Sequence, residues 1–325
     1  MVITITISSW LTRPAKEGKA MNVKMGSVCA AVFLLASSNA LATAYNLPSA
    51  NQTLIGQMQE TAVNTGDTTA TISQRYDIGY NAFTGANPHV NTTQPLLFGE
   101  RLQITTQHIL PNLPRQGIVI NLPEMRMYYY PAGSNQVRTY PIGIGKIGKT
   151  IPIKQTIITK KAKDPVWVPT PSIREYNLEQ GIVLPRVMPA SPDNPLGPYA
   201  IYMGIPTYLI HSTIFPESVG KRASFGCIRM YESDIQDFFP SIQPGVQVTI
   251  INKPVKVGWQ ADRLYIEAYH PLQEHNESNE ASIASMVQQV DEASKGKSTL
   301  VDWQMISFLA EVRDGVPHEV GMQIQ

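Results

Sequence analysis

Residues 208–230 read YLIHSTIFPESVGKRASFGCIRM, and the interpretation of the whole chain depends on this stretch. It begins as a short strand that ends at His211, and it reaches Cys227 sixteen residues later through a loop that contains proline and glycine. A loop of this kind can return the chain so that the imidazole and the thiol meet. A thiol with an ordinary pKa of about 8.5 is only slightly ionised at neutral pH, so attack by Cys227 requires an adjacent base. We therefore expect Cys227 to act as a nucleophile and His211 as the base that activates it.

The residues next to Cys227 favour the same chemistry. Gly226 allows a sharp backbone turn and can bring its own amide close to a substrate oxygen. Arg229 places a positive charge beside the thiol, which favours the thiolate. The sequence contains one other cysteine, Cys29, in an apolar run near the N-terminus, so no disulfide is expected once that run is removed. The alternative for a lone cysteine is an inert buried thiol.

Short strands are predicted on both sides of this stretch. Residues 246–250 alternate between apolar and polar side chains, as a half-buried strand does. Further strands are expected at residues 118–121, 125–130, 137–142, 156–160, 199–202 and 208–211. Proline-rich links at residues 164–171 and 184–198 exclude helices there. The pattern predicts an all-β domain with long loops, in which functional residues are commonly found.

The segment Ser224-Phe225-Gly226-Cys227-Ile228-Arg229-Met230 fits the pattern S-x-G-C-[IV]-R-[ML] that follows a histidine and a loop in L,D-transpeptidases. The sequence therefore resembles the L,D-transpeptidase family with the YkuD-type catalytic domain. Residues 117–121, residues 194–197 and the strand before residues 252–254 are also similar to this family. The resemblance implies a mainly β fold, with a β-sandwich-like catalytic domain over residues 112–268.

The resemblance also implies a mechanism. Cys227 attacks the carbonyl that joins the third residue of a tetrapeptide stem to the terminal D-alanine, and an amine then resolves the thioester. His211 serves first as base and then as acid. The backbone carbonyl of Ser212 is the expected third member of the site, and the amides of Gly226 and Cys227 are the expected oxyanion hole. The strained ring of a carbapenem is expected to acylate the same thiol.

Three more residues are expected to lie along the substrate path, namely Arg229, Ser224 and Trp167. For Trp167, packing and substrate lining are equally compatible with its place in a loop. No cofactor is expected. The histidines outside the site lack metal-ligand spacing, so no metal site is expected either.

An N-terminal module is predicted at residues 65–111. Polar turn residues at 66–68, a short amphipathic stretch at 72–76 and a closing apolar strand near residues 102–104 indicate a β-α-α-β unit. The pattern resembles a LysM module, which grips the glycan strands of peptidoglycan. The alternative is a small α/β cap packed on the next domain. Residues 45–64 are polar and without clear periodicity, and we expect a linker there.

The two ends of the chain carry different signals. Three lysines between residues 16 and 24 precede the apolar run 28–36 and the small residues Ala42 and Ala44, which predicts a cleavable signal peptide over residues 1–44. The run is about half the ~20 residues that a membrane-spanning helix needs, so the mature protein is expected to have no membrane span. Residues 269–325 are expected to form a polar linker and a helical tail, with helices near residues 281–293 and 300–312.

The formal net charge of +1 gives no indication of a nucleic-acid partner. The expected function is that of a periplasmic L,D-transpeptidase acting on peptidoglycan stem peptides. The acyl acceptor is either a second stem peptide, which gives 3-3 cross-links, or the lysine of an outer-membrane lipoprotein. Two alternatives stay open: a hydrolase (L,D-carboxypeptidase) that uses the same Cys/His site, and a non-catalytic peptidoglycan-binding protein.

Overall fold

The structure is a computed structural model that describes residues 43–324. The predicted signal peptide, residues 1–44, therefore lies almost entirely outside the described residues. Among residues 43–324, no helix is both long enough and apolar enough to cross a membrane.

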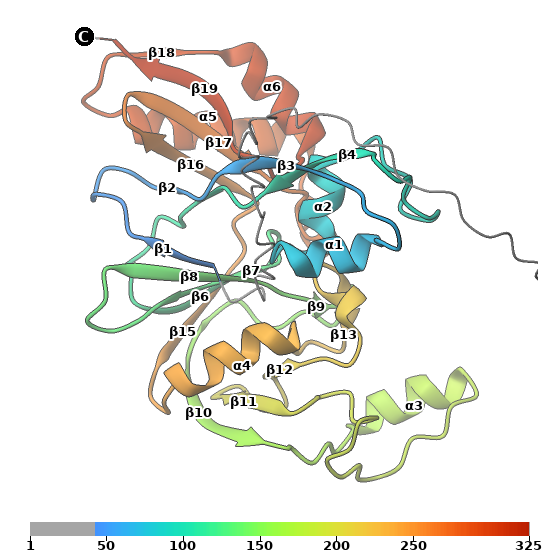
Figure 1. Cartoon of the computed structure of the whole chain (residues 1–325). Coiled ribbons are helices and arrows are strands. Elements are labelled where there is room, and N and C mark those ends of the chain that lie inside the picture. The colour runs from blue at the N-terminus through green and yellow to red at the C-terminus, as the bar shows by residue number, and fades with distance from the viewer. Residues whose placement is uncertain (1–42, 325) are drawn as a thin grey trace, which may run out of the picture. The chain divides into compact units, whose positions relative to one another are not determined.

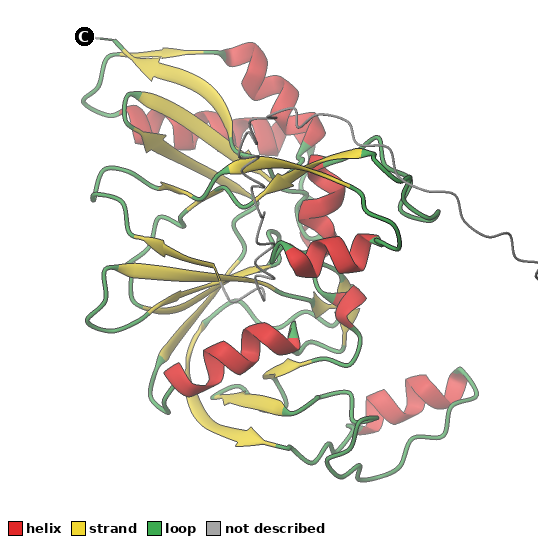
Figure 2. Ribbon diagram, in the orientation of Figure 1, coloured by secondary structure: helices red, strands yellow, loops and turns green. Residues whose placement is uncertain are grey.

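A nine-stranded sheet forms the centre of the fold (Figures 1 and 2). In sheet order its strands are β1 (Thr43–Asn46), β8 (Gln136–Pro141), β7 (Arg126–Tyr130), β6 (Gly117–Asn121), β15 (Gln247–Ile251), β10 (Gln155–Lys163), β11 (Tyr199–Met203), β12 (Leu209–Ser212) and β14 (Ile228–Met230). The start of β10 pairs with β15, whereas the rest of β10 pairs with β11. A register shift between Ile158 and Lys160 marks this change, and Figure 1 shows β10 curving at this point. The sheet thus bends over on itself.

Apolar side chains from both halves of the bent sheet meet in one core. They include Ile118, Ile120, Ile201, Ile210, Ile228 and Met230, all fully buried. Helix α4 (Glu232–Ser241) packs against the same core with Ile235 and Phe238. The ring of Phe238 makes an edge-on contact with Tyr129 at 5.3 Å between centroids. The prediction of a mainly β, sandwich-like domain is confirmed.

The N-terminal module has the predicted β-α-α-β order: β3 (Met58–Ala62), α1 (Thr69–Arg75), α2 (Tyr80–Ala86) and β4 (Arg101–Thr105). Strands β3 and β4 pair antiparallel. Helix α1 begins where Thr68 and Thr71 cap each other reciprocally. Ile72, Phe83 and Ile104 are completely buried between the helices and strands.

The segment expected to be a linker, residues 45–64, is structured instead. It contains the second half of β1, all of β3 and the short strand β2 (Leu54–Ile55), which pairs with β5 (His108–Ile109). Strand β1 extends the large sheet by pairing with β8. Strand β3 is exposed or half-exposed along its whole length, so it carries none of the apolar alternation by which a strand is recognised in sequence.

Residues beyond Lys253 form a second sheet rather than a helical tail alone. Its order is β16 (Val255–Gln260), β17 (Arg263–Ala268), β19 (His318–Gln323) and β18 (Thr299–Val301). The two predicted helices are present as α5 (Asn279–Ser294) and α6 (Trp303–Val312), and they pack on this sheet. The sequence prediction missed β18 and β19, because β18 is short and half-exposed and β19 carries a glycine and few buried residues.

A buried polar cluster links the three parts of the molecule. Lys256 Nζ lies 2.8 Å from Glu124 Oε1 and 2.9 Å from Glu267 Oε2, and His108 Nδ1 lies 3.1 Å from Glu267 Oε1. His108, Glu124 and Glu267 are close enough together to hold a metal ion, which their sequence spacing did not indicate. The ammonium of Lys256 already lies between the two carboxylates, so we interpret the cluster as a charge network.

Candidate active site

The predicted base lies in one of two paired parallel strands, and the predicted nucleophile directly precedes the other. Strand β14 pairs with β12, and His211 lies opposite Arg229. Cys227 directly precedes β14, two residues before Arg229. The Cys227 thiol donates a weak hydrogen bond to the carbonyl of Thr207, with 3.6 Å between sulfur and oxygen. His211 lies in β12, and Cys227 directly precedes β14, the strand that pairs with β12.

His211 is held as a neutral base. Its ring is buried, and Nδ1 donates a hydrogen bond to the carbonyl of Ser212. Burial, and then the charge of Arg229, lower the pKa of His211 from 6.5 to about 4. At neutral pH the imidazole is therefore uncharged. With the proton on Nδ1, Nε2 is the nitrogen that accepts a proton.

The resting thiol is protonated. Burial raises the pKa of Cys227, while a backbone hydrogen bond near Leu209 and the charge of Arg229 lower it. The effect of burial is the largest, so the thiolate-favouring role predicted for Arg229 is outweighed in this state. At neutral pH both side chains are therefore uncharged, the thiol of Cys227 and the imidazole of His211.

Ser224 organises the turn that carries the cysteine. Its hydroxyl donates to the carbonyl of Cys227 at 2.6 Å and accepts from the amide of Gly226 at 3.0 Å. Gly226 has a φ of +113°, and a Cβ there would lie 2.5 Å from a ring carbon of Tyr208. Glycine is therefore required at this position. Since its amide is bonded to Ser224, the prediction that this amide serves as an oxyanion donor is not supported, and the amide of Cys227 is the remaining candidate.

Ser212 is fully buried behind the imidazole. Its hydroxyl donates to the carbonyl of Leu196 at 2.8 Å and accepts from the amide of Tyr199 at 3.2 Å. Gly197 packs directly against it, because a Cβ on Gly197 would lie 2.4 Å from the Ser212 hydroxyl. These bonds fix the backbone carbonyl to which His211 donates.

Arg229 lies beside the pair, and its guanidinium carbon is 5.9 Å from the centroid of the Phe215 ring. Burial lowers the pKa of Arg229, and its Nε has no hydrogen-bond partner among the described residues. A partly buried cation with a free donor suits a site that binds a carboxylate or a developing oxyanion.

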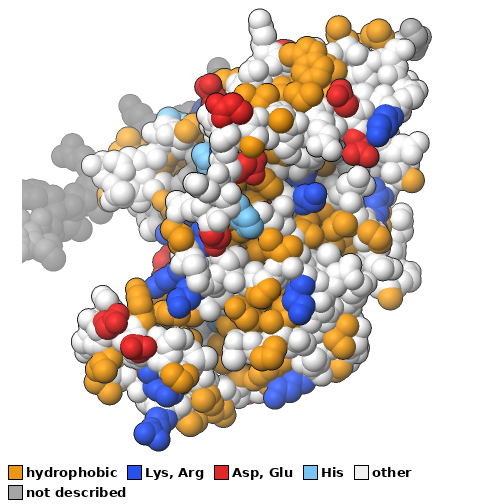
Figure 3. Space-filling model, turned by 180° about the vertical axis from the view of Figure 1, so that it is seen from behind, with side chains coloured by type: hydrophobic (Ala, Val, Ile, Leu, Met, Phe, Trp, Pro, Cys, Tyr) orange, Lys and Arg blue, Asp and Glu red, His pale blue; other side chains and the backbone are white. Residues whose placement is uncertain are grey.

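The long segment between β10 and β11 lies next to the cysteine turn. It contains α3 (Pro171–Glu179), which begins at the cap Thr170 with proline in its first turn, and which the sequence prediction missed. Tyr176 of α3 packs edge-on against Phe225 with 5.0 Å between centroids, and Lys146 Nζ lies 4.2 Å from the Tyr176 ring. Figure 3 shows exposed apolar side chains on the lobe at lower left, where this segment lies.

Trp167 lies in the same segment. It pairs through its backbone with Met188, and its side chain is half-buried. Asn194 joins two parts of the segment, because its side-chain amide donates hydrogen bonds to the carbonyls of Pro165 and Pro189. The sequence prediction included Asn194 only as part of a similar segment, although a buried asparagine before Pro-Leu-Gly was a usable signal.

A residue from the C-terminal part of the chain also supports the site. Glu274 accepts two hydrogen bonds from Arg222, at 2.6 and 2.7 Å, and a short one from Thr150. Arg222 Nε in turn donates to the carbonyl of Gly145 at 3.0 Å, and a Cβ on Gly145 would lie 3.0 Å from Gly226 Cα. Glu274 was assigned to a polar linker, so its role was not predictable from sequence.

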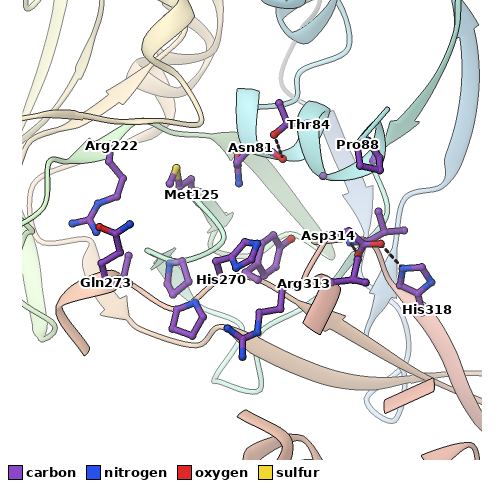
Figure 4. A pocket seen from close by; sticks show the side chains of 18 of the residues that line it. Asn81, Thr84, Pro88, Met125, Arg222, His270, Gln273, Arg313, Asp314 and His318 are labelled. Carbon is purple, nitrogen blue, oxygen red and sulfur yellow. Dashed lines mark hydrogen bonds and ion pairs between the residues drawn. The ribbon is translucent and has the colours of Figure 1, made fainter. Parts of the chain in front are cut away.

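A cavity of about 950 Å³ adjoins this contact (Figure 4). Arg222 and Gln273 lie at one end, and Asp314 and His318 lie at the other. Neither Cys227 nor His211 is among the described residues that line it. The cavity is thus separate from the thiol and approaches it only through Arg222.

A mainly β domain that carries a free thiol is compatible with a cysteine-dependent acyl-transfer enzyme. Residues 115–250 match the L,D-transpeptidase catalytic domain named YkuD, and residues 62–105 match the LysM domain. The chain is 36% identical to the probable L,D-transpeptidase YcfS of Escherichia coli K12 over 98% of this chain and 97% of that protein. It is 40% identical to the probable L,D-transpeptidase YbiS of the same organism over 78% of this chain and 84% of that protein. The chain belongs to the L,D-transpeptidase family.

Among solved structures, L,D-transpeptidase 3 from Mycobacterium tuberculosis aligns with 48% of this chain and 76% of its own, at 15% identity and a TM-score of 0.31. The probable L,D-transpeptidase ErfK/SrfK of Salmonella typhimurium is 38% identical over 87% of this chain and 93% of that protein. The sequence relatives thus span the modules of the chain beyond the catalytic domain.

Proposed function

We propose that this protein transfers acyl groups from peptidoglycan tetrapeptide stems through a thioester on Cys227. The observation that supports the proposal is the pairing of β12 with β14, because Cys227 directly precedes β14 and the buried, neutral His211 lies in β12. An inert thiol needs no base beside it. A binding protein has no use for either residue.

In the proposed first step, His211 Nε2 takes the thiol proton while Nδ1 stays bonded to the carbonyl of Ser212. The sulfur attacks the carbonyl of the third stem residue, and the bond to the terminal D-alanine breaks. His211 then gives its proton to the leaving amine. The amide of Cys227 and the charge of Arg229 stabilise the negative charge on the tetrahedral oxygen.

In the second step an amine attacks the thioester carbonyl and loses a proton to His211, and Cys227 leaves as the thiol. A second stem peptide as acceptor gives a 3-3 cross-link. The lysine of an outer-membrane lipoprotein gives an anchored lipoprotein. Water as acceptor makes the protein an L,D-carboxypeptidase.

The LysM module is proposed to hold glycan strands, and the enzyme to work in the periplasm after export by the signal peptide at residues 1–44. A cleft of about 480 Å³ supports glycan binding. Seven of the sixteen residues that line it carry a hydroxyl group, namely Thr68, Thr69, Ser73, Tyr80, Thr92, Thr93 and Tyr231. The Ser73 hydroxyl is buried without a hydrogen-bond partner among the described residues, and a sugar hydroxyl would satisfy it.

The test is mass spectrometry of muropeptides after incubating the enzyme with purified tetrapeptide-rich wall, with and without lipoprotein. We expect new 3-3 dimers or a lipoprotein adduct, and neither with Cys227→Ala. Tripeptide stems alone would identify a carboxypeptidase. A carbapenem challenge should add one adduct, which digestion places on the peptide containing Cys227. Wild-type transfer by Cys227→Ala would overturn the mechanism.

A further inference from the structure

We infer that the LysM module is a positioning element of the active site, because it holds the loop that joins His211 to Cys227. The inference rests on the proposed function for the identity of the nucleophile and the base. The loop, residues 213–221, runs from the end of β12 to β13 (Arg222–Ser224). One turn of it is the short 3-10 helix Pro216–Ser218.

The catalytic loop completes the start of helix α2. The first amides of a helix have no partner inside the helix, and a side chain at the cap position usually supplies one. The cap of α2 is Gly79, which has no side chain to do so. Instead, the amide of Tyr80 donates to the carbonyl of Val219 at 3.0 Å, and the amide of Asn81 donates to the carbonyl of Gly220 at 3.2 Å.

Two glycines allow this close approach. A Cβ on Gly79 would lie 2.9 Å from Gly220 Cα, and a Cβ on Gly220 would lie 2.2 Å from the amide nitrogen of Tyr80. Non-bonded Cβ atoms essentially never come this close to other atoms. A residue larger than glycine at position 79 or 220 would therefore force the two backbones apart.

Side chains fix the same contact from both sides. The Tyr231 hydroxyl donates to the carbonyl of Ile78 at 3.0 Å, and both groups are buried. Lys221 Nζ lies 3.9 Å from the centroid of the Tyr80 ring. The side-chain amide of Asn81 donates to the carbonyl of Glu124 at 2.8 Å. The LysM module is therefore seated on the catalytic domain by hydrogen bonds to its backbone.

The contact reaches the nucleophile through a short series of bonds. On its other side the loop is bonded to the large sheet, since the amide of Gly220 donates to the carbonyl of Ile142. Ser224 follows Gly220 by four residues, and the Ser224 hydroxyl bonds both the amide of Gly226 and the carbonyl of Cys227. A shift of Gly220 is thus transmitted along the loop to the turn that carries the thiol.

Gly79→Ala tests the inference with a single methyl group. Gly79 has a φ of −84°, which alanine adopts without strain, so the added Cβ acts through its contacts with Gly220 and the Asn81 side chain. We expect the maximal rate of Cys227 acylation by a carbapenem to fall at least tenfold. The carbapenem concentration that gives half of this rate should stay within twofold, because the drug's binding surface is unchanged.

The matched control is Ile104→Val, which removes one methylene group from the core of the same module without touching the loop. It should acylate at the wild-type rate. Ile104→Val should also sediment with insoluble peptidoglycan as the wild type does. A folded Gly79→Ala protein with wild-type acylation would overturn the inference.

Two further measurements keep the test decisive. If Gly79→Ala does not fold, Tyr231→Phe removes only the bond to Ile78, and the inference then requires at least a twofold loss of acylation rate. Alkylation of Cys227 by iodoacetamide between pH 5 and 9 reports on the thiol and its base without any transpeptidation. A changed pH profile in Gly79→Ala supports positioning even if the wild type transfers no stem peptide, and an unchanged profile counts against it.

Discussion

At the scale of single residues, the site combines a thiol whose pKa burial raises with an imidazole whose pKa burial lowers. Both shifts favour the uncharged pair at neutral pH. In the proposed mechanism, the thiolate forms only as the proton moves to His211. Ser212 and Ser224 act through their backbone and hydroxyl bonds, which hold the ring and the turn in place.

The state of His211 predicts how the reaction depends on pH. Because only neutral His211 can accept the proton, and its pKa is about 4, the acylation rate should stay level between about pH 7 and 5.5 and reach half its value near pH 4. Stopped-flow measurement of carbapenem acylation gives this profile, with His211→Ala as the control. An acid midpoint near 6.5, the ordinary value, would contradict the buried neutral imidazole.

The same shift affects stability in a defined window. Between about pH 6.5 and 4 the unfolded chain binds a proton at His211 that the folded protein does not, so stability falls as the pH is lowered through this range.

At the scale of elements, the turn with Cys227 is supported by strands and helices from three parts of the chain. The loop at residues 145–150 lies against Gly226, and Arg222 joins this loop to Glu274. Hydrogen bonds from Arg222 hold the pKa of Glu274 down, to about 2. The ion pair between Arg222 and Glu274 is therefore formed at neutral pH.

Glu274→Gln should weaken the contact between residue 274 and Arg222. We expect the acylation rate to fall about threefold to tenfold, because the loop beside Gly226 loses its charged anchor. The wild type should also be more stable than the variant above about pH 4.5, and this advantage should shrink as the pH falls toward 2, where the carboxylate is protonated. Urea unfolding at pH 6, 4 and 3 measures this trend.

The matched control is Glu292→Gln, which alters an exposed carboxylate of α5 that pairs with Lys295. This change should affect neither the acylation rate nor the pH trend. If both variants changed the acylation rate and the pH trend equally, the ion pair between Glu274 and Arg222 would have no special role.

At the scale of the whole molecule, the LysM module, the catalytic domain and the C-terminal sheet share a buried charge network. Lys256 lies between Glu124 and Glu267, and burial holds the pKa of His108 well below its ordinary value, so this histidine is neutral. The hydroxyls of Tyr128 and Tyr269 donate to the same carboxylates. Removing any one charged group from such a buried network destabilises the folded protein, because its partners are left unpaired.

Lys256→Met should leave two buried carboxylates without their cation. We expect a loss of about 3–5 kcal/mol in the free energy of unfolding, as is usual when one partner of a buried pair is removed. Urea unfolding measures it, with the exposed Lys295→Met as the control that should change little. A loss below about 1 kcal/mol would mean that the ion pairs of Lys256 contribute little to stability.

The class of fold and the family could be predicted from the chain alone, and the residues proposed for the chemistry come from the same stretch of sequence. His211, Cys227 and Ser224 lie within sixteen residues, and their spacing across one loop reflects local backbone geometry. The strands of the main sheet carry apolar patterns because their faces are buried. Information of this kind is local, so it can be read from neighbouring residues.

The supports of the site were decided by tertiary structure. Glu274 comes from a polar stretch and Gly79 from another module, and neither carries a local signal of its partner. The sequence analysis expected the amide of Gly226 to belong to the oxyanion hole, whereas in the fold this amide donates a hydrogen bond to the Ser224 hydroxyl. The neutral state of His211 follows from burial under distant strands. Close packing and desolvation depend on which distant segments contact each other in the fold, and local sequence does not specify these tertiary contacts.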